Sequence, residues 1–319
     1  MLSLVPFTVN GVTDLLRLLA LPVLAWAAAR DLRTRRVPNR TWLPLVAFGA
    51  VLLAWDAWDT AAPGLFALQV AVGVGVVAPL GFAFWWLGAF GGADAKALAA
   101  VCVLFPLPPA YLVGATTLPL SPVSGAFPLS ILTDAVLLAG FVPLFLFVRN
   151  ALAGRLSLAG FVGRPVDWRA LPTTHGRLLA RPNGLDAGLD LDALRMYLAW
   201  RGERLRDLRA TPDRARDPAS LPAEPHPPGD GAVGPVTDGG RTATRADQWG
   251  AAAFLDGLDG DAYGTTPTGL RGALDAIVAR ERLWVSPGIP FLVALFAGLC
   301  LALVYGDLLY TVVDGLGLL

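Results

Sequence analysis

Six long apolar runs constrain the fold of this chain more than any other feature of its sequence. They cover roughly residues 12–29, 41–55, 65–87, 97–113, 131–148 and 289–313. A helix of about 20 apolar residues is long enough to cross the hydrocarbon core of a bilayer. Charged residues make up only 16% of the chain, against about 25% in ordinary soluble domains. The sequence therefore predicts an all-α polytopic membrane bundle of six transmembrane helices.

An arginine cluster directly after the first run orients the predicted bundle. Its members are Arg30, Arg33, Arg35, Arg36 and Arg40. Basic residues beside membrane spans concentrate on the cytoplasmic side, so we expect the N-terminus outside and, after six spans, the C-terminus outside as well. The charges follow the apolar run instead of preceding it, which indicates an anchor and not a signal peptide. Each arginine could also do no more than set the topology and bind lipid headgroups.

Two acidic residues fall at predicted cytoplasmic ends of spans. Asp31 follows the first run, and Asp94 stands before the fourth, 63 residues later. An ionisable group at the edge of a span is costly and is therefore a candidate functional residue. Two carboxylates at one membrane face could share a proton and activate a water for peptide hydrolysis. Asp94 taken alone could instead be a helix cap, and Lys96 could stabilise charge, contact substrate or only reach towards the interface.

Two motifs carry a resemblance to a known family. The first is Asp31 followed by Arg36-Val37-Pro38-Asn39, and the second is Gly91-Gly92-Ala93-Asp94-Ala95-Lys96. Together they resemble the prepilin peptidases, in particular the archaeal prepilin and preflagellin peptidases. The resemblance covers roughly residues 12–148 and 287–313. Ala93 stands where many relatives have glycine, which is a minor departure because that position accepts other apolar residues in the family.

The resemblance implies roles for individual residues. It implies that Asp31 and Asp94 are catalytic, with Gly91, Gly92 and Lys96 in support. Pro290 and Phe291, at the start of the last run, are similar to the family's Pro-Phe element near the active site and are candidates for the substrate site. No cofactor or metal ion is implied.

The activity implied is that of a membrane aspartic endopeptidase acting at the cytoplasmic membrane face. Its partners would be membrane lipid and prepilin or archaellin precursors, whose N-terminal leader it would remove. One alternative is a presenilin-like intramembrane aspartyl protease, although Asp31 is expected to follow a span and not to lie within one. Another is a proton-coupled transporter or a membrane scaffold, although transporters usually show internal repeats, and none is visible here.

Residues 149–286 differ in composition from the rest of the chain. They hold 18 of the 25 basic and 17 of the 25 acidic residues, which predicts a solvated cytoplasmic insert between a membrane domain at 1–148 and a final span at 287–319. Helical patterns at 189–208 and 250–282 flank residues 211–247, whose polar, Pro- and Gly-rich composition predicts a disordered linker.

Two further classes of function are excluded by composition. His175 and His226 have no acid-rich or cysteine neighbours at ligand spacing, and Cys102 and Cys300 lie in apolar runs, so no metal site is expected. The net charge is zero, which gives no reason to expect nucleic acid as a partner.

Asp307, near the end of the last run, is expected at the outer interface.

Overall fold

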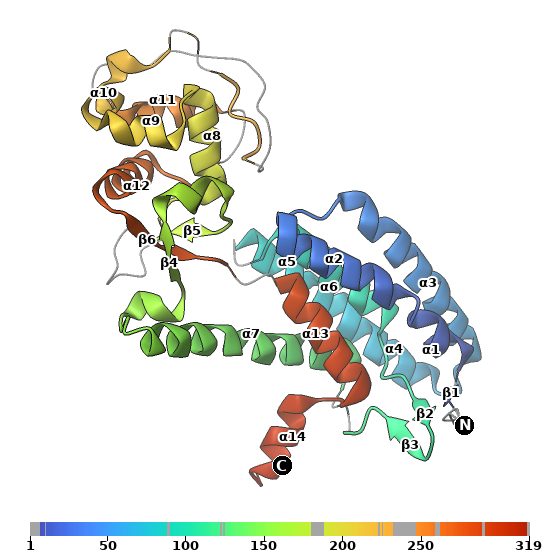
Figure 1. The fold of residues 1–319 in the computed structure, drawn as a ribbon. Coiled ribbons are helices and arrows are strands. Elements are labelled where there is room, and N and C mark those ends of the chain that lie inside the picture. Colours follow the sequence, from blue (N-terminus) through green and yellow to red (C-terminus); the bar gives the residue numbers. More distant parts are fainter. Residues whose placement is uncertain are drawn as a thin grey trace, which may run out of the picture. The chain divides into compact units, whose positions relative to one another are not determined.

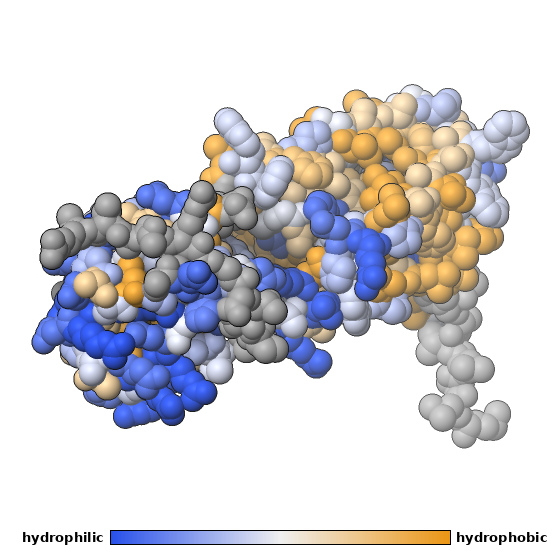
Figure 2. All heavy atoms as spheres, turned by 90° about the horizontal axis from the view of Figure 1, so that it is seen from above, coloured by the Kyte–Doolittle hydropathy of each residue, from blue (hydrophilic) through white to orange (hydrophobic). Residues whose placement is uncertain are grey.

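The structure is a computed structural model in which the chain forms two compact units. It describes all residues except 1–6, 10, 88, 89, 122, 124, 180–187, 223, 225, 232–246, 259–261, 289, 290, 318 and 319, with the backbone alone for residues 7–9. The first unit comprises residues 1–141 and 289–319, and the second comprises residues 142–288. Exposed apolar side chains dominate the surface of the first unit, whereas the second is mostly hydrophilic (Figure 2).

Helices make up most of the first unit (Figure 1). In chain order they are α1 (Val12–Arg17), α2 (Ala20–Thr34), η1 (Asn39–Thr41), α3 (Trp42–Asp59), α4 (Pro63–Val72), the π-helical η2 (Gly73–Val77), α5 (Ala78–Trp86), α6 (Gly92–Leu104), α7 (Phe127–Leu152), α13 (Phe291–Val304) and α14 (Leu308–Gly315). A small antiparallel sheet joins β1 (Phe7–Val9), β2 (Tyr111–Val113) and β3 (Thr116–Leu118) in that order. The prediction of a mostly helical chain is confirmed, with this sheet as an addition.

Six membrane spans are not confirmed. In the described part of the chain, four helical segments are long and apolar enough to cross a bilayer: Val12–Thr34, Asn39–Asp59, Pro63–Trp86 and Phe127–Leu152. The pair α13 and α14 would make a fifth, but it bends by 63° between Val304 and Leu308. The predicted fourth span is replaced by α6, whose 13 residues rise only about 20 Å along the helix axis. Pro106 and the two prolines that follow explain why this helix stops early.

Helix α6 is buried among its neighbours. Ala95, Leu98 and Cys102 are completely inaccessible, and the helix contacts α3, α5, η2 and α13. A helix that is apolar on all sides belongs in the interior of a bundle. Glycines on the neighbouring helices permit this packing, because a Cβ at Gly49 would lie 3.1 Å from the backbone nitrogen of Leu104 and one at Gly81 would lie 2.9 Å from the Leu98 side chain.

A buried polar network joins α1 to the far end of α6. The Arg17 guanidinium donates to the Leu104 carbonyl oxygen at 2.6 Å and pairs with Asp14 at 2.9 Å and with Asp56 of α3. Leu104 is the last residue of α6, so its carbonyl has no acceptor role within the helix. The two charged residues that interrupt the first apolar run are therefore satisfied inside the unit.

The second unit has a mixed core. Its elements are η3 (Leu158–Phe161), β4 (Arg164–Asp167), η4 (Trp168–Thr173), β5 (Arg177–Leu178), α8 (Leu191–Arg201), α9 (Leu205–Ala210), α10 (Pro212–Arg216), η5 (Pro218–Ser220), η6 (Gln248–Gly250), α11 (Ala251–Asp256), α12 (Pro267–Ala279) and β6 (Arg282–Ser286). Central β6 pairs antiparallel with β4 and β5. Tyr197, Trp249 and Phe254 are among the fully buried side chains of its core.

The predicted linker at 211–247 is not disordered throughout. Residues 212–216 form α10, and 218–220 form a 3-10 turn. Pro212 starts the helix, where its missing N–H costs nothing. Ala215 is buried in the core, and Arg216 pairs with Asp275 of α12 at 3.1 Å. Residues 223, 225 and 232–246 of this range lie outside the described residues.

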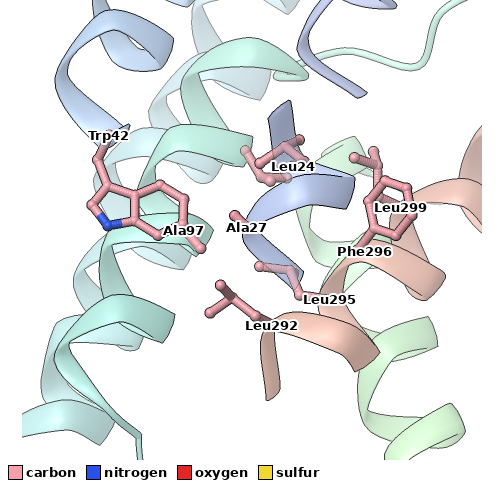
Figure 3. Close-up of a pocket in the computed structure, with 9 residues that line it drawn as sticks. Leu24, Ala27, Trp42, Ala97, Leu292, Leu295, Phe296 and Leu299 are labelled. Atoms are coloured by element: carbon pink, nitrogen blue, oxygen red, sulfur yellow. The ribbon is translucent and has the colours of Figure 1, made fainter. Parts of the chain in front are cut away.

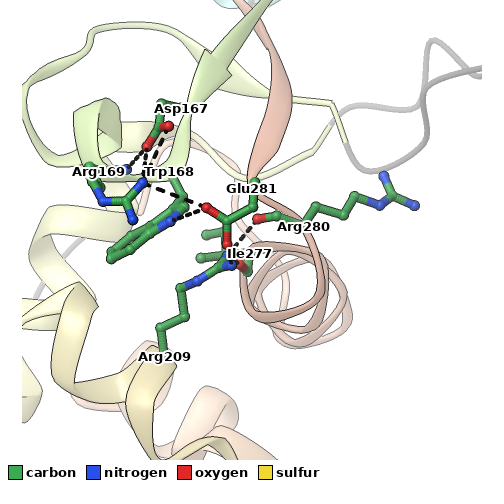
Figure 4. A network of polar contacts seen from close by, with 7 residues as sticks. All are labelled: Asp167, Trp168, Arg169, Arg209, Ile277, Arg280 and Glu281. Atoms are coloured by element: carbon green, nitrogen blue, oxygen red, sulfur yellow. Dashed lines mark hydrogen bonds and ion pairs between the residues drawn. The ribbon is translucent and has the colours of Figure 1, made fainter.

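A polar network around Trp168 closes one side of this core (Figure 4). The guanidinium carbons of Arg169 and Arg209 each lie 4.7 Å from the indole ring centroid, and the indole N–H donates to Glu281 at 3.0 Å. Arg209 also donates to the backbone carbonyls of Ile277 and Arg280 at the end of α12. Those carbonyls have no partner within the helix, so Arg209 caps α12 and links it to α9.

Candidate active site

Asp31 lies in the last turn of α2. Its side chain is buried, with 8% of the residue exposed. The helix ends because Arg35 takes a left-handed conformation with φ 55° and because Pro38 disfavours helix just before it. The Arg35 backbone N–H closes the end by donating to the Asp31 carbonyl at 2.8 Å. The helix continues past Asp31 to Thr34, so Asp31 lies in its last turn and not after the helix.

Asp94 is the third residue of α6. Its Oδ2 accepts the Gly91 backbone N–H at 2.9 Å, and the backbone N–H of Leu292, at the start of α13, lies near enough to lower the pKa of this carboxyl group. A Cβ at Gly91 would lie 3.1 Å from Asp94 Oδ2, which is tight. Asp94 thus satisfies an orphan N–H of the helix start, as the capping alternative predicts, but from inside the first turn and not as the N-cap.

The structure brings Asp31 and Asp94 close enough for their charges to interact. The pKa of Asp94 is raised to about 6, chiefly by burial and also by the nearby Asp31 carboxylate, against the opposing effects of the Gly91 and Leu292 backbone N–H groups and of the positive charge of Arg35. Asp94 lies in α6, outside the four candidate spans. Two carboxylates coupled in this way titrate as a pair, and burial favours the state that holds one proton.

Lys96 contacts the other sequence motif. Its Nζ donates to Asn39 Oδ1 at 2.7 Å, which ties the second turn of α6 to the Arg36-Val37-Pro38-Asn39 segment after α2. A direct hydrogen bond therefore holds the segment after Asp31 against the helix that contains Asp94. Among the alternatives for Lys96, this geometry favours a positioning role over a group that only reaches the interface.

Phe291 packs against the residue before the Gly91-Gly92 pair. The rings of Phe291 and Phe90 have centroids 4.2 Å apart, and Phe84 meets the other side of Phe90 at 5.1 Å. Pro290, the other candidate of the Pro-Phe element, lies outside the described residues. Gly92 faces the Trp85 indole, 3.5 Å from where its Cβ would be. The turn that carries Asp94 is thus held by aromatic side chains from α5 and α13.

An apolar pocket lies among four helices of the first unit (Figure 3). Its walls come from α2, α3, α6 and α13 and consist of Leu24, Ala27, Trp42, Ala97, Val101, Leu292, Leu295, Phe296 and Leu299. Ala27 precedes Asp31 by four residues and Ala97 follows Asp94 by three, so both walls lie on the same helix faces as the acids. The site therefore combines two interacting carboxylates with an adjoining apolar cavity.

Part of this chain is similar to a known family. The family model described as "Type IV leader peptidase family" matches residues 18–148. We call these residues the leader peptidase stretch. Prepilin peptidase EppA of Methanothermobacter thermautotrophicus is 29% identical over 133 residues, which are 40% of this chain and 34% of that protein. The chain thus spans about a third of the length of this curated relative.

The leader peptidase stretch contains both Asp31 and Asp94 but not the whole of the site. It runs from the turn before α2 almost to the end of α7, whereas α13, which supplies Leu292, Phe291 and part of the pocket, lies beyond it. The confirmed resemblance therefore covers the two acid-bearing motifs, and the structure adds the last helix to them.

A second pair of buried acids lies away from this site. Asp134 of α7 accepts the Leu308 backbone N–H at 3.1 Å, and Asp307 accepts the Ser130 hydroxyl at 2.7 Å and caps α14 through the Tyr310 N–H. Asp307 is only 5% exposed and is therefore enclosed by protein, and its expected depth at the outer interface stays a prediction. Asp307 follows the end of α13, whereas Asp94 lies beside the start of that helix. The helix is about 20 Å long, so the two pairs of acids are well apart.

Several residues of the site were missed by sequence reasoning. Phe90 and Leu292 act through a ring contact and a backbone N–H, and neither type of contact has a signature in a single sequence. Asn39 stands in the quoted motif, so its polar side chain next to Pro38 was a visible signal. Its partner, Lys96, was identified without it.

Proposed function

We propose that this protein is an aspartic endopeptidase of the membrane that removes N-terminal leader peptides from prepilin-type precursors, archaellin precursors included. The observation that carries the proposal is the electrostatic interaction between Asp31 and Asp94 at the ends of two helices of the leader peptidase stretch. The named relative is a prepilin peptidase. Asp31 and Asp94 are the proposed catalytic pair.

The proposed reaction uses the pair as base and acid. The ionised carboxylate takes a proton from a water molecule, which attacks the carbonyl carbon of the scissile peptide bond. The protonated carboxyl group polarises the carbonyl oxygen by donating a hydrogen bond, and the leaving amine finally receives a proton. A pair that holds one proton supplies both functions at once. Arg35 favours the ionised form of Asp94 and so limits how tightly the pair retains its proton.

The proposed substrate matches the apolar lining beside the acids. A prepilin-type precursor has a short basic leader followed by a hydrophobic helix. An apolar side chain near the cleavage point would contact Leu24, Leu292 and Leu295 once these side chains move apart to admit it, while the peptide bond lies at the carboxylates.

The orientation follows from the arginines. We place Asp31 and Asp94 in the cytoplasm, because the cluster after α2 is strongly basic. On this arrangement the leader is cut on the side where precursors are made. The N-terminus, before the first candidate span, would then lie outside.

The test is co-expression with a tagged archaellin or pilin precursor. Precursor length is compared for the parent, Asp31→Asn, Asp94→Asn and Asp59→Asn, where Asp59 is an exposed acid at the end of α3. We expect processing by the parent and by Asp59→Asn, and a loss of at least about 1,000-fold in the other two. Continued processing by either of those two, or none by the parent, would refute the proposal. Equal melting temperatures in detergent would show that the inactive variants are folded.

A further inference from the structure

The second unit carries an apolar surface directly after the end of α7. Outside α7, the exposed large apolar side chains in the described part of this unit are Leu156, Leu158, Phe161 and Tyr263. The first three lie within six residues of one another, and they continue from Leu152, the last residue of α7, which is 85% exposed. Leu156 and Leu158 are 76% and 62% exposed. We call Leu152, Leu156, Leu158 and Phe161 the apolar patch.

The patch is built on a fixed turn and not on a loose loop. Asn150, almost fully buried, donates from Nδ2 to the carbonyl oxygens of Gly160 and Gly163, both at 2.9 Å. The Phe161 ring stacks on Phe147 of α7, with centroids 4.0 Å apart and ring planes 8° from parallel. The segment therefore folds back onto the last turns of α7. This fixed turn holds the leucines of the patch in their exposed positions.

The turn is also anchored on its other side. Ala159 is completely inaccessible, and a Cβ at Gly163 would lie 3.1 Å from the Val285 carbonyl oxygen of β6. Strand β4 begins at the next residue, Arg164, and pairs with Val285. The apolar patch is thus held between a candidate membrane span and the sheet of the second unit.

The charged residues nearest to the patch along the chain are all positive. Arg149, Arg155 and Arg164 are exposed, and the chain contains no acidic residue between Asp134 and Asp167. Apolar side chains beside arginines, with no acid among them, match the boundary between lipid headgroups and acyl chains. Arginines near such a boundary attract anionic headgroups. A protein partner would have to displace lipid from a surface that continues directly from a candidate span.

We propose that the apolar patch and its three arginines form a lipid-binding element that docks the second unit on the membrane surface where α7 ends, with anionic lipids as the ligands. Helix α7 is one of the four candidate spans, so its last residue lies where the hydrocarbon core gives way to headgroups. The turn after it places Leu156 and Leu158 beside that border. The arginines reach the headgroup phosphates, which accept hydrogen bonds from guanidinium groups. This inference does not depend on the proposed peptidase activity.

The test uses one labelled cysteine in the full chain. Leu156→Cys is made in a background with Cys102→Ala and Cys300→Ala, labelled with a polarity-sensitive fluorophore and placed in nanodiscs of phosphatidylcholine and phosphatidylglycerol. Asp213→Cys is the control, because that side chain is 96% exposed and lies on α10 of the same unit. We expect nitroxide lipids to quench the label at 156 and aqueous iodide to quench it at least about fivefold less than the label at 213. Leu158→Cys is the second site if the first variant does not fold.

The anionic preference is tested separately. Nitroxide-labelled phosphatidylglycerol should quench the label at 156 about threefold more strongly than nitroxide-labelled phosphatidylcholine. The triple variant Arg149→Gln, Arg155→Gln, Arg164→Gln should lose this difference, whereas Arg206→Gln, an exposed arginine of α9, should keep it. Iodide quenching at 156 equal to that at 213 would overturn the proposal. Protection from both iodide and nitroxide lipid would also overturn it, because a protein surface would then cover the patch.

Discussion

The ring of Phe291 lies against the ring of Phe90, with 4.2 Å between their centroids, and this contact joins the first residue of α13 to the turn that precedes Asp94. Phe90 and Phe291 stand 201 positions apart in the chain. The backbone N–H of the next residue, Leu292, lies near enough to lower the pKa of Asp94. Helix α13 thus meets the Asp94 turn at two adjacent residues.

Removal of this contact should impair catalysis more than folding. We expect Phe291→Ala to lower kcat/KM for precursor cleavage by roughly 10- to 100-fold, because a shift of about 1 Å in a catalytic group has effects of that size. Phe291→Leu should retain more activity than Phe291→Ala. Phe82→Ala, which removes an exposed ring from α5, is the matched control and should leave kcat/KM unchanged. Equal activity of Phe291→Ala and parent would contradict the positioning role.

The Lys96–Asn39 hydrogen bond makes a prediction about coupling. Lys96→Met and Asn39→Ala should each reduce precursor cleavage, and the double variant should be little worse than either, because both single changes remove the same contact. The coupling free energy from a double-mutant cycle on kcat/KM should be about 0.5–3 kcal/mol. If Lys96 instead binds substrate directly, the two effects would simply add.

The pH dependence of cleavage should report the acid pair. Burial raises the pKa of Asp94 to about 6. Above that pH both carboxylates are ionised and no acid remains, so kcat/KM should fall about tenfold per pH unit on the alkaline side. Arg35 lowers the pKa of Asp94. Arg35→Gln should therefore raise this pKa and move the alkaline limb to higher pH, whereas Arg40→Gln should not. An unmoved limb would show that the Arg35 charge does not act on the pair.

The orientation of the chain can be measured independently of activity. In the background without Cys102 and Cys300, Asp59→Cys at the end of α3 should react with a membrane-impermeant maleimide in intact cells. Arg40→Cys, an exposed position between α2 and α3, should react only after the cells are opened. The reason is the basic cluster between α2 and α3, which favours the cytoplasm. The reverse pattern of labelling would place Asp31 and Asp94 outside.

Asp247 should stabilise the second unit in a pH-dependent way. Burial tends to raise its pKa, but the backbone N–H groups of Ala252 and Ala253 and the Arg271 guanidinium donate to it and together hold the pKa below 3.8. The stabilisation is present above the unfolded pKa and is lost as the pH falls through the lower folded pKa. Asp247→Asn should cost roughly 1–3 kcal/mol, measured at pH 7 as faster amide exchange in α11. Asp256→Asn, an exposed acid of the same helix, is the control.

Much of the architecture was predictable from local patterns. Runs of apolar residues indicated the helices around Leu24, Leu52 and Ile131, because each such helix satisfies its own backbone and needs only apolar surroundings. Apolar residues at helical spacing in 189–208 and 250–282 indicated α8, α9, α11 and α12. The pairing of Asp31 with Asp94 was a hypothesis from motifs and topology, and the structure brings the two close together.

Other features depend on partners distant in the chain. Residues 97–113 read as a membrane span from their composition alone, but Pro106 ends α6 and the surrounding helices bury it. Ala215 reads as part of a polar linker, but the core of the second unit holds it. Asp307 is enclosed by protein, where Ser130 donates to it.

The sequence by itself determined that the chain is a helical membrane protein with two acids in family motifs, because apolar length and motif residues are local properties. Only the tertiary structure decided that α6 is an interior helix, that α13 contacts Asp94 through Leu292, and that Lys96 binds Asn39. Each of these depends on side chains or backbone groups brought together from distant positions. Contacts of that kind follow from how the helices pack, and packing depends on all the surfaces at once.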